Sequence, residues 1–351
     1  MLYNHIGNLM SRILLPLSIT ATLMGGAAYA DAPRVAVDIA PVHSLVARVM
    51  DGVGTPDLII QSGASPHEYS LRPSEALALQ EANLVFWIGP DLTPWLTETI
   101  KTLAPNAAVT ALLETEGTLE LAFRDSALFE AHDHDDSGDE DHDDHAEEEN
   151  HDDHDDHAEE EDHDDHNDHG EEEGHEDHDH GAHDPHAWLS PQNAANWLNV
   201  IAAQLSAADP DNAGAYFANA AASRAEMYTL MTQVNATLDP VRGRRFVVFH
   251  DAYQYFESDF DFPAFGAISI GDASDPSPAR IAEIQGRIAD EGIACVLAEP
   301  QFNAGLVTTV LSGSDANTGV IDPLGSDLEP GAALYPQLIS NMSTALADCL
   351  E

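Results

Sequence analysis

Short apolar runs alternate with segments of helical periodicity in the first part of the chain. The apolar runs are residues 34–40, 57–61 and 84–89, and amphipathic patterns separate them at 41–50 and 72–82. Runs of this length are typical of buried strands, whereas the intervening patterns are typical of surface helices. Strands that alternate with helices predict a parallel sheet with helices on its faces.

The same alternation returns after residue 244. "RFVVFHD" (245–251), "ACVLAEP" (294–300) and "TGVIDPLG" (318–325) are the apolar runs, and an amphipathic helix is predicted over 279–292. The predicted fold class is therefore α/β, with two Rossmann-like lobes that each contain a mostly parallel sheet flanked by helices.

Two helices are predicted between these parts. The first begins at Ser190, a residue suited to capping, with Pro191 in the first turn, where its missing N–H costs nothing. The second covers about 212–238 and would measure roughly 40 Å, long enough to join the lobes as one rigid rod. Its expected buried face consists of Phe217, Ala220, Arg224, Met227, Met231, Val234 and Leu238.

The first thirty residues are expected to be a cleaved signal peptide. Arg12 precedes an apolar stretch that is short for a membrane span, and the small residues Ala28 and Ala30 precede Asp31. An uncleaved anchor helix is the alternative. The resulting organisation is a signal peptide at 1–30, an N-terminal lobe at 31–210, a linking helix at 211–240 and a C-terminal lobe at 241–351.

The chain has only two cysteines, Cys295 and Cys349. In an exported protein, two cysteines form a disulfide more often than they remain as two free thiols. A metal site built from thiolates is correspondingly disfavoured.

Charge is distributed very unevenly. The chain carries 63 acidic and 12 basic side chains, and residues 132–183 alone contain 28 Asp or Glu, 14 His and no Lys or Arg. Such a segment cannot bury enough apolar surface to fold, so a disordered acidic, histidine-rich insert is predicted over 125–184. The negative charge argues against nucleic acid and anionic membranes as partners and favours cations.

The insert repeats short groups of carboxylates and imidazoles that would give many weak, overlapping metal sites. We expect it to act as a low-affinity collector of metal ions, and a merely solvating spacer is the alternative. The histidines of its most regular part are His151, His154, His157, His163, His166 and His169.

Three histidines outside the insert occupy positions suited to ligand binding. His67 lies in a loop between a strand and a helix, His186 precedes a helix cap, and His250 ends a predicted strand. Ligands bind beyond the carboxyl ends of strands in open α/β sheets, so these imidazoles can converge on one cation. Imidazole suits zinc, copper and nickel. His43, within a predicted helix, is expected to be an ordinary half-buried residue.

The fourth donor is left open between water and a carboxylate. Asp322, at the end of the last predicted strand, is the best carboxylate, and Glu299 is expected to be a hydrogen-bond partner of a ligand. Three histidines with an open position also describe a catalytic zinc site. A zinc hydrolase is therefore an alternative, although no H-E-x-x-H motif accompanies these residues.

Five stretches carry a family resemblance: "GASPHEYSLRPSEALALQEANLVFWIGP", "DPHAWLSP", "RFVVFHDAYQYFE", "CVLAEPQF" and "DPLG". In order and spacing they resemble the periplasmic zinc-binding proteins of bacterial high-affinity zinc ABC importers, the ZnuA type. The resemblance runs from about residue 34 to the C-terminal region. It implies two α/β lobes joined by one long helix, and a function in Zn²⁺ delivery to a membrane permease rather than catalysis.

The resemblance also assigns residues. It implies that His67, His186 and His250 are the zinc ligands, with a variable fourth position open to water or Asp322, and that Cys295 pairs with Cys349. Histidine at position 250, where manganese-binding relatives have a carboxylate, supports zinc. A soluble periplasmic monomer is expected, with small lobe movements on binding. A periplasmic zinc buffer that serves no transporter remains the other alternative.

Overall fold

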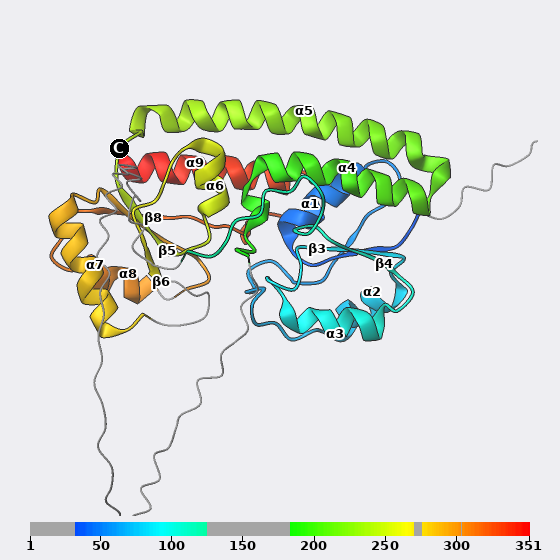
Figure 1. The fold of residues 1–351 in the computed structure, drawn as a ribbon, viewed down its shortest axis with the longest axis horizontal. Coiled ribbons are helices and arrows are strands. Elements are labelled where there is room, and N and C mark those ends of the chain that lie inside the picture. Colours follow the sequence, from blue (N-terminus) through cyan, green and yellow to red (C-terminus); the bar gives the residue numbers. More distant parts are fainter. Residues whose placement is uncertain (1–31, 125–182, 270–275, 303) are drawn as a thin grey trace, which may run out of the picture. The chain divides into compact units, whose positions relative to one another are not determined.

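Two parallel four-stranded sheets form the framework of the protein (Figure 1). The computed structural model describes residues 32–124, 183–269, 276–302 and 304–351. The first sheet has the order β2-β1-β3-β4, and its strands are β1 (Val35–Val37), β2 (Asp57–Leu58), β3 (Leu84–Trp87) and β4 (Ala108–Ala111). The second has the order β6-β5-β7-β8, and its strands are β5 (Phe246–His250), β6 (Ala267–Ser269), β7 (Cys295–Ala298) and β8 (Asn317–Val320).

Helices connect and cover these strands, as the alternating pattern predicts. They are α1 (Ala40–Val49), α2 (Pro73–Glu81), α3 (Pro94–Leu103), α4 (Pro191–Ala208), α5 (Ala213–Leu238), α6 (Gln254–Phe260), α7 (Pro278–Glu291), α8 (Ala304–Val310) and α9 (Leu334–Leu350). Every strand pair within the two sheets is parallel. The predicted class of two α/β halves with one long helix is therefore confirmed.

Helix α4 starts where the sequence predicts. The Ser190 hydroxyl accepts a hydrogen bond from the backbone N–H of Asn193 at 3.0 Å, and Pro191 occupies the first turn. A cap of this kind satisfies one of the N–H groups that a helix start leaves without a partner.

The long helix α5 matches its predicted bounds, but part of its predicted buried face is wrong. Tyr216 is buried in place of Phe217, which is 51% exposed, and Ser223 is buried in place of the half-buried Arg224. The Tyr216 hydroxyl donates to a carboxylate oxygen of Asp209 at 2.8 Å, which satisfies its polar group inside the core. The neighbours of the helix, rather than its own periodicity, decide which side is buried.

A second helix besides α5 ties the two sheets together. Helix α9 packs against β7 and β8 of the second sheet and also against α1 and α5, and Figure 1 shows α4 and α9 between α5 and the sheets. The backbone N–H of Tyr335 donates to the Ser44 hydroxyl at 3.0 Å, and the Tyr335 hydroxyl donates to the carbonyl of Trp188 at 2.8 Å. The main hydrophobic core accordingly contains residues from both sheets. A shared core of this kind resists wide hinge motion.

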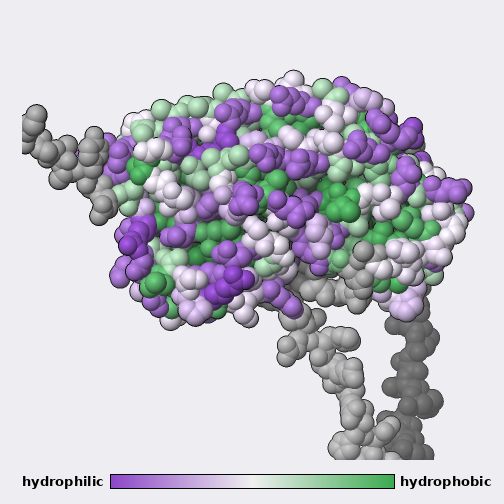
Figure 2. Space-filling model, turned by 180° about the vertical axis from the view of Figure 1, so that it is seen from behind, coloured by the Kyte–Doolittle hydropathy of each residue, from purple (hydrophilic) through white to green (hydrophobic). Residues whose placement is uncertain are grey.

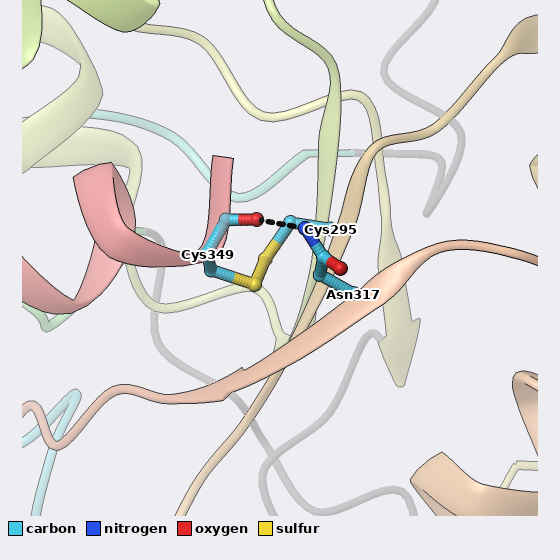
Figure 3. Close-up of a disulfide and its surroundings, with 3 residues drawn as sticks. All are labelled: Cys295, Asn317 and Cys349. Atoms are coloured by element: carbon cyan, nitrogen blue, oxygen red, sulfur yellow. Dashed lines mark hydrogen bonds between the residues drawn. A yellow bond between two sulfur atoms is a disulfide. The ribbon is translucent and has the colours of Figure 1, made fainter. Parts of the chain in front are cut away.

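The expected disulfide is present (Figure 3). Cys295 begins β7 and Cys349 lies near the end of α9, with Cα atoms 5.7 Å apart. The side-chain amide of Asn317 in β8 donates to the carbonyl of Cys349 at 2.9 Å. The last turns of α9 are therefore fastened to two adjacent strands.

The surface does not single out a functional face by its hydrophobicity. Figure 2 shows hydrophilic residues spread among hydrophobic ones over the face turned away from the view of Figure 1. Large exposed apolar side chains come from several elements, including Leu77 of α2, Phe217 of α5 and Val320 of β8. Among the described residues, the helices are too short or too polar to cross a membrane. The polar side chains at the ends of the strands are a better guide to a functional site than surface hydrophobicity.

Candidate metal centre

The three histidines predicted to converge line one pocket. His250 is the last residue of β5, His67 lies in the loop between β2 and α2, and His186 directly precedes the 3-10 turn Ala187–Leu189. The pocket walls are Ser65, Pro66, His67, His186, Trp188, His250, Glu299, Gln301, Phe302, Pro323 and Leu324. Residues from both sheets thus meet beyond the carboxyl ends of parallel strands, where ligands of open α/β sheets bind.

His186 and His250 are held at a spacing that suits a tetrahedral metal ion. Both side chains are buried, and their Nε2 atoms lie 3.4 Å apart. Two nitrogens bound to zinc at about 2.05 Å in a tetrahedron would be roughly 3.3 Å apart. The two Nε2 atoms therefore already occupy positions close to one edge of such a coordination sphere.

Carboxylates hold the other ring nitrogen of each histidine. Nδ1 of His186 lies 2.7 Å from Oδ1 of Asp184, and Nδ1 of His250 lies 2.6 Å from Oε1 of Glu299. A carboxylate accepts hydrogen bonds, so Nδ1 carries the proton in both rings and Nε2 presents its lone pair to the pocket. The predicted role of Glu299 as a hydrogen-bond partner is confirmed. The sequence analysis missed Asp184, although its place two residues before His186 was the available signal.

The walls around this pair are aromatic. The Trp188 ring lies 5.2 Å from that of His186, and the Phe302 ring lies 5.1 Å from that of His250, centroid to centroid. Few waters can compete inside such walls, and the effective dielectric constant is low. Charges near the pocket are consequently felt strongly by a bound cation.

His67 completes the set from the other side of the pocket. Its ring is half-buried and its centroid lies 5.8 Å from that of His186. The loop is anchored where Trp95 Nε1 donates to the carbonyl of Pro66 at 2.9 Å and where the His67 N–H donates to the Ser65 hydroxyl at 3.3 Å. Among the described residues, no group of three His, Cys, Asp or Glu side chains is already arranged to hold a metal ion.

In this structure, the carboxylate of Asp322 stabilises a backbone turn. Its carboxylate accepts hydrogen bonds from the backbone N–H groups of Leu324, Gly325 and Ser326 at 3.0, 3.1 and 2.5 Å, and from Nε2 of Gln301 at 3.2 Å. These bonds hold the turn that places Pro323 and Leu324 in the pocket wall. By contrast, Oε2 of the pocket residue Glu299 is buried without a hydrogen-bond partner among the described residues.

A buried cluster of charges lies behind the histidine pair. Arg124 pairs with Asp251 at 2.8 Å and with Glu257 at 2.6 Å, and Asp184 is buried nearby. Burial raises the pKa of Asp251 to about 7 and also raises the pKa of Glu257, although Arg124 opposes both shifts. Three carboxyl groups thus share one guanidinium beside the histidine pair.

The histidines proposed for weak binding, His151, His154, His157, His163, His166 and His169, lie outside the described residues, as does the stretch 125–182. His183 and Asp184, the last two residues of the predicted insert, are described. His183 pairs with Ala122 in an antiparallel bridge, and its ring nitrogens lie 3.6 and 3.7 Å from carboxylate oxygens of Asp91 and Glu120.

His43 is an ordinary core residue, as expected. It is buried in α1 with Nε2 3.1 Å from the carbonyl of Pro56. Burial lowers the pKa of its imidazole.

Known proteins similar to this chain are metal-handling proteins. A family profile described as "Zinc-uptake complex component A periplasmic" matches residues 35–349. The "High-affinity zinc uptake system protein ZnuA" of Brucella suis biovar 1 is 44% identical over 339 residues, covering 97% of this chain and 98% of the relative. The protein of the same name from Paracoccus denitrificans is 45% identical over 336 residues, covering 95% and 97%.

Solved structures share the fold at lower identity. One described as "Crystal structure of ZnuA" superposes with a TM-score of 0.67 at 20% identity, covering 92% of this chain and all of that chain. The binding protein FpvC from Pseudomonas aeruginosa, solved in complex with Mn²⁺, superposes with a TM-score of 0.68 at 17% identity, covering 91% and 98%.

Proposed function

This chain belongs to the ZnuA family of periplasmic zinc-uptake components, and from that premise we propose that it captures Zn²⁺ in the pocket of His67, His186 and His250. It hands the ion to the membrane permease of a zinc ABC importer. The observation that carries the assignment of the pocket is the pair of Nε2 atoms 3.4 Å apart, each on a ring whose Nδ1 is held by a carboxylate. The transported ion is cargo, so the site must both bind and release it.

The fourth coordination position is open to water or Asp322. Water is favoured, because Asp322 would have to give up hydrogen bonds to three backbone N–H groups to reach a metal ion. With two donors preset, capture then requires mainly a movement of the His67 loop. The core shared by both sheets and the packing of α9 on α1 support a small rearrangement rather than a wide closure.

The test is zinc titration by calorimetry and chelator competition. Metal-free mature chain, beginning at Asp31, is compared with His186→Ala, His250→Ala and a His183→Ala control, whose ring lies outside the pocket. We expect one tight site in the parent and a loss in the first two variants beyond the roughly 10- to 100-fold typical of lost supporting groups. Tight binding that survives both substitutions would contradict the proposal.

Residues 1–30 act as a signal peptide in this proposal, and the mature protein works in the periplasm as a monomer. The lobes at 31–210 and 241–351 are linked by the helix within 211–240. Amino-terminal sequencing of exported protein and light scattering of the purified chain test these points.

The family is one of transport proteins, and we propose that the chain has no catalytic role. A three-histidine zinc hydrolase would cleave activated esters in a zinc-dependent manner. A periplasmic buffer that serves no transporter would leave growth on limiting zinc unaffected when the gene is deleted. Either result would replace the transport proposal.

A further inference from the structure

Two segments, one on each side of residues 125–182, pair with each other. Ala122 and His183 form an antiparallel bridge, and the N–H of Asp184 donates to the carbonyl of Leu121 at 2.8 Å. We name residues 121–124 together with 183–186 the stem. His186 ends the second segment of the stem, so the position of the stem sets the position of one of the two buried histidines.

The stem is docked on α6, the helix that begins four residues after His250. Nε2 of Gln254 donates to the carbonyl of Ala122 and to Oδ2 of Asp184, both at 3.0 Å. The Tyr255 hydroxyl donates to the carbonyl of Asp184 at 2.7 Å and accepts from the Leu121 N–H at 3.0 Å. The contacts thus join the segment that carries His186 to the segment that carries His250.

Arg124 provides the charged part of this interface. Its guanidinium donates from one nitrogen to Oδ1 of Asp251 at 2.8 Å and from another to Oε2 of Glu257 at 2.6 Å. Asp251 directly follows His250, and Glu257 is buried in α6. A planar guanidinium can serve both carboxylates at once, which the single ammonium of a lysine does less well.

Removal of this cation would leave like charges together in a buried place. Asp184, Asp251 and Glu257 belong to the two sides of the interface, and all three lie within the electrostatic reach of Arg124. Without it, the stem loses its hydrogen bonds to Asp251 and to Glu257 of α6, and the buried carboxyl groups lose their counter-charge. The Nε2 atoms of His186 and His250 would then move away from the spacing that suits a tetrahedral ion.

We propose that Arg124 is a positioning residue of the zinc site, which fixes the distance between His186 and His250 by clamping the stem onto α6. This inference rests on the proposed function. It assigns a role in metal binding to a residue whose ion pairs are with Asp251 and Glu257 and that lies directly before the insert.

The test compares Arg124→Gln and Arg124→Lys with the parent chain and with an Arg242→Gln control. Arg242 donates to the carbonyls of Phe260 and Asp261 at the other end of α6, away from the stem, at 2.9 and 3.0 Å. Three quantities are measured on the metal-free mature chain: zinc affinity by chelator competition, the visible absorption spectrum after loading with Co²⁺, and the melting temperature.

Arg124→Gln is expected to lower zinc affinity by about 10- to 100-fold and to change the Co²⁺ ligand-field bands, which report ligand geometry. Arg124→Lys should fall between this variant and the parent, and Arg242→Gln should bind zinc within about twofold of the parent. Should Arg124→Gln fail to fold, Glu257→Gln removes the buried partner with little change of shape and is expected to shift the same bands.

An unchanged affinity and Co²⁺ spectrum in Arg124→Gln, with only a lower melting temperature, would make Arg124 a merely structural residue and overturn the inference. The proposed function is tested separately, with the variants of His186 and His250. If zinc binding does not depend on these two histidines, the proposed function fails whatever the result for Arg124.

Discussion

The Nε2 atoms of His186 and His250 lie 3.4 Å apart although the two residues are 64 positions apart in the chain. Each ring is turned toward the other because its Nδ1 is bound to a carboxylate, Asp184 in one case and Glu299 in the other. If zinc binds here as proposed, part of the cost of ordering its ligands is therefore met when the protein folds.

The orienting carboxylates should contribute to affinity without touching the ion. We expect Asp184→Asn and Glu299→Gln each to weaken zinc binding by about 10- to 100-fold, because the amides disturb the tautomer and the direction of the ring. Chelator competition measures the effect. Glu98→Gln is the matched control, since Glu98 pairs with the exposed Lys101 of α3, outside the pocket. Equal affinities for all three variants would show that the rings need no such support.

Asp322 should matter more for stability than for zinc affinity. Asp322→Ala leaves three backbone N–H groups of the following turn without their acceptor, at a cost of about 1–3 kcal/mol for each group that stays unsatisfied. Urea denaturation of the metal-free protein is expected to shift to a lower midpoint, while Asp322→Asn retains zinc affinity within about fivefold. A loss of zinc affinity in Asp322→Asn with unaltered stability would instead identify Asp322 as the fourth ligand.

Deletion of the insert should separate weak from tight binding. Because Ala122 and His183 pair directly, residues 126–181 can be replaced by a short glycine turn that leaves the stem intact. Calorimetry should then show the tight site unchanged and the weaker zinc-binding events lost. Retention of the weak events would favour the spacer interpretation, whereas loss of the tight site would relocate it to the insert.

Asp38 should give the fold a specific pH dependence. Burial raises its pKa to about 7, while its carboxylate accepts bonds from the N–H groups of Ile39 and Ile88 at 2.8 and 2.7 Å. A raised pKa means that the folded state binds the proton more tightly than the unfolded state does. The contribution of Asp38 to stability is therefore fully present below about pH 4 and is lost as the pH rises from there through about 7.

Asp38→Asn removes this titration. Urea denaturation of metal-free parent and variant at pH 5 and pH 8 measures the difference in their free energies of unfolding. The advantage of the parent over the variant should shrink at pH 8. An advantage that grows with pH would mean that the carboxylate is ionised in the fold and stabilised by its two N–H partners.

The local pattern of apolar and polar residues was sufficient to predict much of the fold. The strands that end in His250 and precede Glu299 are buried on both faces, so they appear as continuous apolar runs, and the Ser190 cap is a local signal. Strands β4 and β6 were not predicted. Both are short edge strands, and β4 is largely exposed, so neither produces a long apolar run.

Only part of the proposed metal centre could be predicted from the sequence. Histidines at strand ends could be found because their positions follow from the order of elements. Arg124 and the stem could not, because their importance depends on which helix they meet after folding. The misassigned face of α5 has the same origin, since α4 and α9 determine which of its residues are covered.

Helix α9 has a consequence for the timing of folding. It comes after every other described element in the chain, yet Tyr335 contacts α1, the first helix, across 291 positions. Contacts between such distant segments slow folding, because a long loop must close before they form. A chain that emerges from its amino-terminal side cannot complete its central core until α9 has emerged too. Incomplete lengths would leave α1 and α5 without the helix that packs against both of them.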